Sequence, residues 1–162
     1  MNQPKRIEIN IGEQRLRYWE NGALVMDVPV STAKNGAGEQ QGSECTPRGE
    51  HIIRAKIGDG CLPGTVLVGR RPTGEIYSRE LGERFPGRDW ILTRILWLSG
   101  CEPGRNRLGD VDSMRRYIYL HGTPDHVVLG APGSRGCVRM RNSDIIALFD
   151  RVPAGTPVII SE

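Results

Sequence analysis

One cysteine in this chain stands among residues that favour reactivity. Cys137 follows Ser134, Arg135 and Gly136, and Arg139 comes two positions later. A thiol attacks as its thiolate, and nearby cationic groups favour that form. A glycine just before the cysteine lets a substrate carbonyl approach backbone N–H groups, which stabilise the negative charge that develops on its oxygen. This pattern predicts a cysteine that performs acyl transfer.

A proton acceptor for this thiol is available upstream. His121 lies in Leu120-His121-Gly122 at the end of a strand-like run, where it could hold or accept the thiol proton. His126 is the competing base, but Asp125 beside it favours a turn, and we prefer His121. His51 is interpreted as a strand residue without a catalytic role.

Arginines gather around the cysteine more densely than elsewhere in the chain, which favours a small anionic substrate. If the chain is extended after Cys137, Arg139 shares its face and could hold the thiolate or a substrate carboxylate. The alternative is a structural ion pair that fixes the loop, and the sequence leaves both open. Arg141 has the same two interpretations.

Other uses of these residues fit less well. A protein phosphatase also needs an arginine-supported cysteine, but its arginine follows six residues later, where this chain has Ser143. Cys45, Cys61 and Cys101 form no Cys-x-x-Cys pair, so we expect no zinc site, no metal and no redox dithiol. No organic cofactor is expected either.

Composition describes an ordinary globular chain. It has 162 residues, 38% hydrophobic and 25% charged residues, and a net charge of +3, and we expect one domain over residues 1–162. The basic residues are scattered among 19 acidic ones, so nucleic acid is not an expected partner. Without an apolar leader or a membrane-length run, we expect no membrane partner and a cytoplasmic location, or a periplasmic one if a leader has been removed.

Alternating apolar residues predict a mostly β fold. Strands are expected near residues 7–11, 16–18 and 24–30, with Asn21-Gly22 as a tight hairpin turn. Further strands are expected at residues 51–57, 66–68, 116–121 and 158–160, with loops at 33–42, 58–64 and 100–113 and an excursion from the sheet at 70–90. Residues 90–98 are apolar and fit either a strand or a buried helix.

One helix is predicted after Met140. Asn142 is a good N-cap, and apolar residues recur at helical spacing before Pro153 ends the segment: Ile145, Leu148, Phe149 and Val152.

Residues 119–160 resemble the L,D-transpeptidase catalytic domain of the YkuD type. Several motifs occur in the order of that family: His121-Gly122-Thr123, the segment Ser134 to Met140, Asn142-x-Asp144, and Gly155-Thr156-Pro157-Val158. The N-terminal residues 29–32 and Thr46-Pro47-x-Gly49 also look like the family, whereas residues 58–115 contain insertion-like loops. The resemblance implies a β-sandwich with one or two short helices packed on the sheet.

The resemblance also implies the chemistry. The family cysteine attacks a peptidoglycan stem tetrapeptide at the bond between its diamino acid and the terminal D-alanine, and an acyl-enzyme forms. An amine from a second stem then gives a cross-link, and water gives an L,D-carboxypeptidase.

Residue roles follow from the same resemblance. Cys137 is expected to be the nucleophile, His121 the general base, and the Gly122 carbonyl the group that orients the imidazole ring. Gly136 and Cys137 are expected to supply the oxyanion N–H groups. Among the substrate-binding residues, Ser134 lines the site beside Arg139, and Arg135 stands where the family commonly has a histidine.

Because no leader is visible, we favour a cytoplasmic L,D-carboxypeptidase that trims muropeptides during wall recycling. The alternatives are a periplasmic transpeptidase that forms cross-links and a non-catalytic wall-binding module, which would be expected to lack the nucleophile or the base. The sequence does not predict the oligomeric state.

Overall fold

The computed structural model describes residues 4–162, so residues 1–3 of the predicted domain lie outside the described part. Ten strands and two short helices follow one another in this order: β1 (Lys5–Asn10), β2 (Arg15–Glu20), β3 (Ala23–Pro29), β4 (Gly49–Ile57), β5 (Thr65–Val68), β6 (Arg71–Ile76), α1 (Arg79–Arg84), β7 (Ile91–Gly100), β8 (Tyr119–Gly122), β9 (Val138–Met140), α2 (Asn142–Arg151) and β10 (Pro157–Ser161). The predicted mostly β fold with one or two short helices is confirmed.

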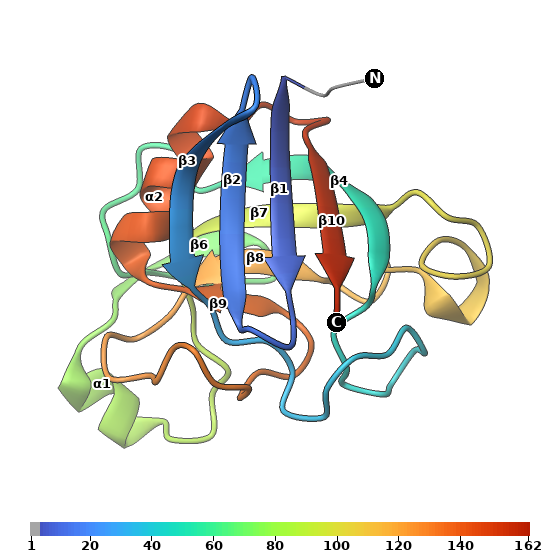
Figure 1. Cartoon of the computed structure of the whole chain (residues 1–162). Helices are drawn as coiled ribbons and strands as arrows, with labels where there is room; N and C mark the ends of the chain where they lie inside the picture. The colour runs from blue at the N-terminus through green and yellow to red at the C-terminus, as the bar shows by residue number, and fades with distance from the viewer. Residues whose placement is uncertain (1–3) are drawn as a thin grey trace.

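The strands form one curled sheet. Its order is β3-β2-β1-β10-β4-β7-β5-β6, and β8 pairs with both β7 and β9. Strands β3, β2, β1 and β10 make one layer, and β7, β8 and β9 cross behind it, with β4 passing between the two layers at one side (Figure 1). Two inner faces packed in this way enclose the core of a sandwich.

The predicted N-terminal meander is present. β1 and β2 are antiparallel, and so are β2 and β3, with Asn21 and Gly22 at φ angles of 50° and 81° in the turn between them. Two successive positive φ angles suit the right-handed twist of a hairpin, which explains why this dipeptide favours it. β10 then pairs in parallel with β1 and antiparallel with β4, so the last strand lies between two earlier ones.

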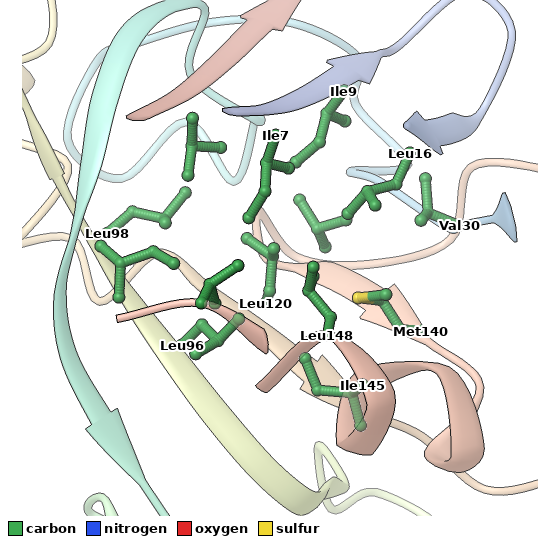
Figure 2. Packing of buried hydrophobic residues seen from close by; sticks show 14 of the residues in the cluster. Ile7, Ile9, Leu16, Val30, Leu96, Leu98, Leu120, Met140, Ile145 and Leu148 are labelled. Carbon is green, nitrogen blue, oxygen red and sulfur yellow. The ribbon is translucent and has the colours of Figure 1, made fainter. Parts of the chain in front are cut away.

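The core lies between the layers. Figure 2 shows apolar side chains of both layers meeting those of α2: Ile7, Ile9, Leu16, Val30, Leu96, Leu98, Leu120, Met140, Ile145 and Leu148. Each of them is at most 1% exposed. This packing holds β8, β9 and the start of α2 in fixed positions, because well-packed cores tolerate little displacement.

The apolar segment at 90–98 is a strand. β7 pairs along its edges with β4, β5 and β8. Successive residues of β7 are buried, so both of its faces are covered and it lacks the alternation that would have identified it. The predicted strand at 116–121 is shorter than expected and begins at Tyr119. Tyr117 has a φ of 57°, which is incompatible with an extended strand.

The helix after Met140 is confirmed as α2, but its predicted cap is wrong. Arg141 occupies the N-cap position without a side-chain cap bond, and Asn142 is the first helical residue. Ile145, Leu148 and Phe149 face the core as their spacing predicts.

The excursion at 70–90 is more ordered than predicted. It contains β6, which extends the edge of the sheet beside β5, and α1, which buries no side chain and projects below the layers (Figure 1). Neither of the helices found within residues 4–162 is long and apolar enough to span a bilayer.

Leu148→Ala should lower the free energy of unfolding by about 3 kcal/mol, because a fully buried leucine leaves a cavity on truncation. Leu62→Ala is the matched control, since Leu62 is 68% exposed, and should change stability by less than about 0.5 kcal/mol. Urea unfolding of both variants measures the difference. Equal effects would contradict the assignment of α2 to the core.

Candidate active site

Parallel pairing of β8 with β9 brings the two predicted catalytic side chains together. Leu120 pairs with Val138 and His121 with Arg139, and Cys137 directly precedes β9. The thiol of Cys137 and the imidazole of His121 both line a cavity of about 370 Å³. The pairing of β8 with β9, behind the N-terminal layer (Figure 1), thus brings His121 and Cys137 into the same region of the molecule.

The thiol is held by backbone groups of the segment that enters β8. Cys137 Sγ donates to the carbonyl of Tyr117 at 3.3 Å and accepts the N–H of Tyr119 at 3.3 Å. The positive φ of Tyr117 marks the turn from which its carbonyl reaches the sulfur. No hydrogen bond joins the thiol to His121, although both residues are described.

Burial decides the charge of the thiol. It raises the pKa of Cys137 to about 12, against the Tyr119 N–H and the charges of Arg139 and Arg116, which lower it, while Asp89 adds to the rise. The arginines therefore act in the expected direction, because their positive charges favour the thiolate. Loss of hydration of the anion outweighs them, so burial favours the neutral form of the thiol.

The predicted orientation of His121 is observed. Its Nδ1 lies 2.6 Å from the carbonyl oxygen of Gly122, and because a carbonyl only accepts, Nδ1 carries the hydrogen. Nε2 is left as an acceptor. The side chain is buried, and burial lowers the pKa of His121, so the ring is neutral and able to take a proton at pH 7.

The residue after His121 has to be glycine. A Cβ at Gly122 would lie 2.7 Å from the carbonyl of Leu92 and would clash with Asn142 Oδ1. That oxygen accepts the Thr93 hydroxyl at 2.6 Å, and Asn142 Nδ2 donates to the carbonyl of Thr123 at 3.0 Å. Asn142 therefore connects α2, the β7 bulge and the end of β8 next to Gly122, a role that its interpretation as a cap missed.

A second small network shapes the cysteine loop. The Ser134 hydroxyl donates to the carbonyl of Cys137 at 2.5 Å and accepts the N–H of Gly136 at 3.1 Å. Gly136 has a φ of 131°, and a Cβ at this position would lie 3.2 Å from the carbonyl oxygen of Cys45, so a side chain would be strained there. Of the two predicted oxyanion donors, Gly136 is thus engaged within the loop, and Cys137 N–H has no partner among residues 4–162.

The two predicted substrate-binding arginines differ in environment. Arg139 donates to the carbonyl of Gly133 at 3.1 Å and forms an ion pair with Asp89 at 3.4 Å, yet it still lines the cavity. Arg135 lines the same cavity, is exposed, and has no ion-pair partner within residues 4–162. Arg141 lies outside this cavity and pairs with Asp144 on the surface at 3.6 Å.

Two further arginines line the cavity and were missed. Arg116 donates to the carbonyls of Glu39 at 3.1 Å and Cys45 at 2.7 Å, and burial lowers its pKa. Arg70 reaches the cavity from the turn between β5 and β6. Arg116 precedes His121 closely in the chain, and this short separation could have indicated that it lies near the site. The sequence around Arg70 contains no feature that places Arg70 near the site.

The other candidates lie elsewhere. His126 is exposed and its ring faces Tyr77, at 6.3 Å between centroids, in a separate hollow. His51 is buried in β4 and contacts the carbonyl of Gly49 and the hydroxyl of Ser113, so its interpretation as a strand residue fits. Within residues 4–162, no three His, Cys, Asp or Glu side chains are grouped as metal ligands.

The neutral thiol predicts a steep pH dependence. Below a pKa of about 12 the thiolate fraction grows tenfold per pH unit, so alkylation of Cys137 by iodoacetamide should accelerate about tenfold per unit from pH 7 to pH 10. Mass spectrometry of the peptide that contains Cys137 follows the rate without interference from other cysteines. A rate that is already constant below pH 8 would instead indicate a thiolate–imidazolium pair.

Gly122→Ala should abolish activity or destabilise the fold, because the added methyl displaces Asn142 or the Leu92 carbonyl. Gly87→Ala is the control, since open space surrounds the position that its Cβ would take and its φ is not positive. The temperature of thermal unfolding should fall by several degrees for Gly122→Ala alone. A Gly122→Ala protein as stable and active as Gly87→Ala would disprove this close approach.

Comparison with known proteins shows the family to which the chain belongs. The family model of the L,D-transpeptidase catalytic domain (YkuD) matches residues 4–160. The probable L,D-transpeptidase ErfK/SrfK of Salmonella typhimurium is 49% identical over 155 residues, which cover 95% of this chain and 43% of that protein. The probable L,D-transpeptidase YbiS of Escherichia coli is 49% identical over 164 residues, which cover 94% of this chain and 43% of that protein.

A solved structure shares the fold. L,D-transpeptidase 3 from Mycobacterium tuberculosis, in complex with a faropenem-derived adduct, superposes with a TM-score of 0.61 at 16% identity, over 98% of this chain and 60% of that one. This chain spans less than half the length of the two enterobacterial relatives. With the family match extending over nearly every residue, from the first strand to the last, the chain belongs to the L,D-transpeptidase catalytic domain family.

Proposed function

We propose that this chain is a cysteine acyltransferase that cleaves the bond between the diamino acid and the terminal D-alanine of a peptidoglycan stem tetrapeptide. The observation that supports it most directly is the shared cavity of Cys137 and His121, with the imidazole oriented by the Gly122 carbonyl. A nucleophile and a base positioned by a third group are the requirement for covalent acyl transfer.

The first step is transfer of the thiol proton. Cys137 leaves the carbonyl of Tyr117, its proton passes to Nε2 of His121, and the sulfur attacks the scissile carbonyl. The Cys137 N–H, which has no partner among the described residues, is available for the developing oxyanion. When the C–N bond breaks, the amine of D-alanine takes the proton from His121, and a thioester remains on Cys137.

We favour water as the acceptor of the acyl group. His121, neutral again, takes a proton from water, and hydrolysis of the thioester releases the tripeptide and regenerates the thiol. An L,D-carboxypeptidase of this kind suits a cytoplasmic role in muropeptide recycling, where water is abundant and polymeric acceptor strands are few. The location is part of the proposal.

An amine acceptor is the second candidate. Two relatives that are 49% identical have the names of probable L,D-transpeptidases. A hollow of about 790 Å³, lined by Tyr77, Trp90 and His126, adjoins the catalytic cavity through Arg139 and has room for a second peptide. If this hollow receives an acceptor stem, the product is a cross-link and the chain acts as a transpeptidase.

The test is mass spectrometry of products formed from disaccharide-tetrapeptide. Loss of one alanine supports the carboxypeptidase, and a cross-linked dimer supports the transpeptidase. Cys137→Ala should abolish either product while the protein remains folded, because no other described cysteine lines the cavity. Turnover by a folded Cys137→Ala variant would contradict the proposed role of Cys137 as nucleophile.

His121→Gln and His126→Gln form a matched pair within the same experiment. His121→Gln should slow acylation at least about 100-fold, the usual contribution of a positioned base, and His126→Gln should have little effect. Trapping of Cys137 by a carbapenem, detected as a mass increase, separates an enzyme from a wall-binding module. The neighbour with a faropenem-derived adduct motivates this probe.

A further inference from the structure

We propose that Arg70 binds a carboxylate of the peptide substrate next to the bond that Cys137 attacks, and so selects stems in which that carboxylate is free. This inference rests on the proposed function. It assigns a specificity role to a residue outside every motif of the catalytic segment.

Arg70 is fixed at the cavity wall. It occupies the turn between β5 and β6 with a φ of 64°, and it lines the cavity together with Tyr117, Tyr119 and Cys137. Its guanidinium carbon lies 4.7 Å from the ring centre of Tyr117 and 5.1 Å from that of Trp97. Its Nη1 donates to the hydroxyl of Tyr119 at 3.1 Å. Two aromatic contacts and one hydrogen bond thus restrict the orientation of the planar group.

The charge of Arg70 has no counter-ion among residues 4–162. The carboxylate in the cavity wall, Asp89, forms its ion pair with Arg139. Apart from the bond to Tyr119, the side-chain donors of Arg70 have no partner in the described part of the chain. A guanidinium with free donors and little freedom to move is suited to bidentate binding of a carboxylate.

Tyr119 connects this arginine to the nucleophile. Its hydroxyl accepts the hydrogen bond of Arg70, and its backbone N–H donates to the sulfur of Cys137. In a stem tetrapeptide, the carboxylate of the terminal D-alanine lies within about 4 Å of the carbonyl under attack, because only the amide nitrogen and Cα separate them. The side-chain carboxylate of the diamino acid is the other source within the same residue pair.

A purely structural role would use the same contacts. Arg70 could simply fasten the β5–β6 turn to Trp97 and Tyr117, in which case its loss would impair every substrate alike. The two roles differ in how the effect of losing Arg70 depends on the substrate carboxylate. An arginine that only stabilises the turn would affect an acid substrate and its amide equally.

The chain supplies a matched control. Arg54 in β4 also stacks on Trp97, at 5.9 Å from the ring centre, but it is exposed and lines neither the catalytic cavity nor the adjoining hollow. Arg54→Gln removes the same charge and a contact with the same ring. Arg70→Lys keeps the charge and removes the planar fork.

The experiment measures kcat/KM of the wild type and these variants on three tetrapeptides: the free acid, the D-alanine carboxamide, and the amide of the diamino acid side chain. Arg70→Gln should lower kcat/KM for the free acid roughly 10- to 100-fold, mainly through KM. On the amide that lacks the recognised carboxylate, the variant and the wild type should differ by less than about threefold. Which amide behaves in this way identifies the carboxylate. Arg70→Lys should be intermediate and Arg54→Gln unchanged.

An equal loss on the acid and on both amides would overturn the proposal, and so would no loss on the acid. A wild type that forms no Cys137-dependent product contradicts the proposed function instead. In that case the role of Arg70 is tested by the ratio of the rates at which iodoacetate and iodoacetamide alkylate Cys137. This measurement tests carboxylate binding by Arg70 without requiring catalytic turnover. A ratio that falls several-fold in Arg70→Gln but not in Arg54→Gln supports carboxylate binding, and an unchanged ratio refutes it.

Discussion

The active site depends on hydrogen bonding between two very short strands. β8 has four residues and β9 has three, yet their parallel pairing sets His121 beside the segment that begins with Cys137. So short a pair could not persist in isolation. It is held by the core, in which Leu120, Val138 and Met140 are fully buried against α2 and the N-terminal layer. The relative position of His121 and Cys137 therefore depends on the packing of the core.

Burial and charge oppose each other around the nucleophile. The cavity wall contains four arginines and one aspartate, a balance of charge that by itself favours an anion at Cys137. Desolvation opposes that field: it raises the pKa of the thiol and lowers the pKa of the imidazole, so burial favours the neutral form of both groups. The positive surroundings are better suited to charges that arrive with a substrate or develop on the attacked oxygen. Without substrate, the sulfur is held by hydrogen bonds to the carbonyl of Tyr117 and the N–H of Tyr119.

Sequence reasoning succeeded where a residue type determines a local geometry. Asn21-Gly22 predicted its hairpin, the spacing from Ile145 to Phe149 predicted α2, and the order of motifs indicated the family. It failed where tertiary contacts override local preference. Asn142 looks like a cap but bonds to Thr93 in a distant bulge, and β7 loses its alternation because both faces are covered.

The site shows the same division. Cys137, His121 and Gly122 were predictable because motif order marks them. The structure brings Cys137 and His121 to one cavity, and the Gly122 carbonyl accepts a hydrogen bond from the imidazole. Asp89, Arg116 and Arg70 come from loops whose placement depends on the whole sheet. No motif marks them, and only the short separation of Arg116 from His121 hints at proximity. The sequence indicates the direction in which each neighbouring group shifts the pKa of the thiol. The net shift depends on how deeply the thiol is buried, which only the structure gives.

The position of β10 has a consequence for biosynthesis. β10 pairs on one side with β1 and on the other with β4, so until residues 157–161 leave the ribosome both of these strands keep an unpaired edge. The nascent chain can close its first hairpins early, but the layer that backs the catalytic strands forms only after the final strand inserts. Such late, non-local closure is slow and leaves unpaired strand edges exposed, so a chaperone that shields strand edges would have most effect before residues 157–161 pair with β1 and β4.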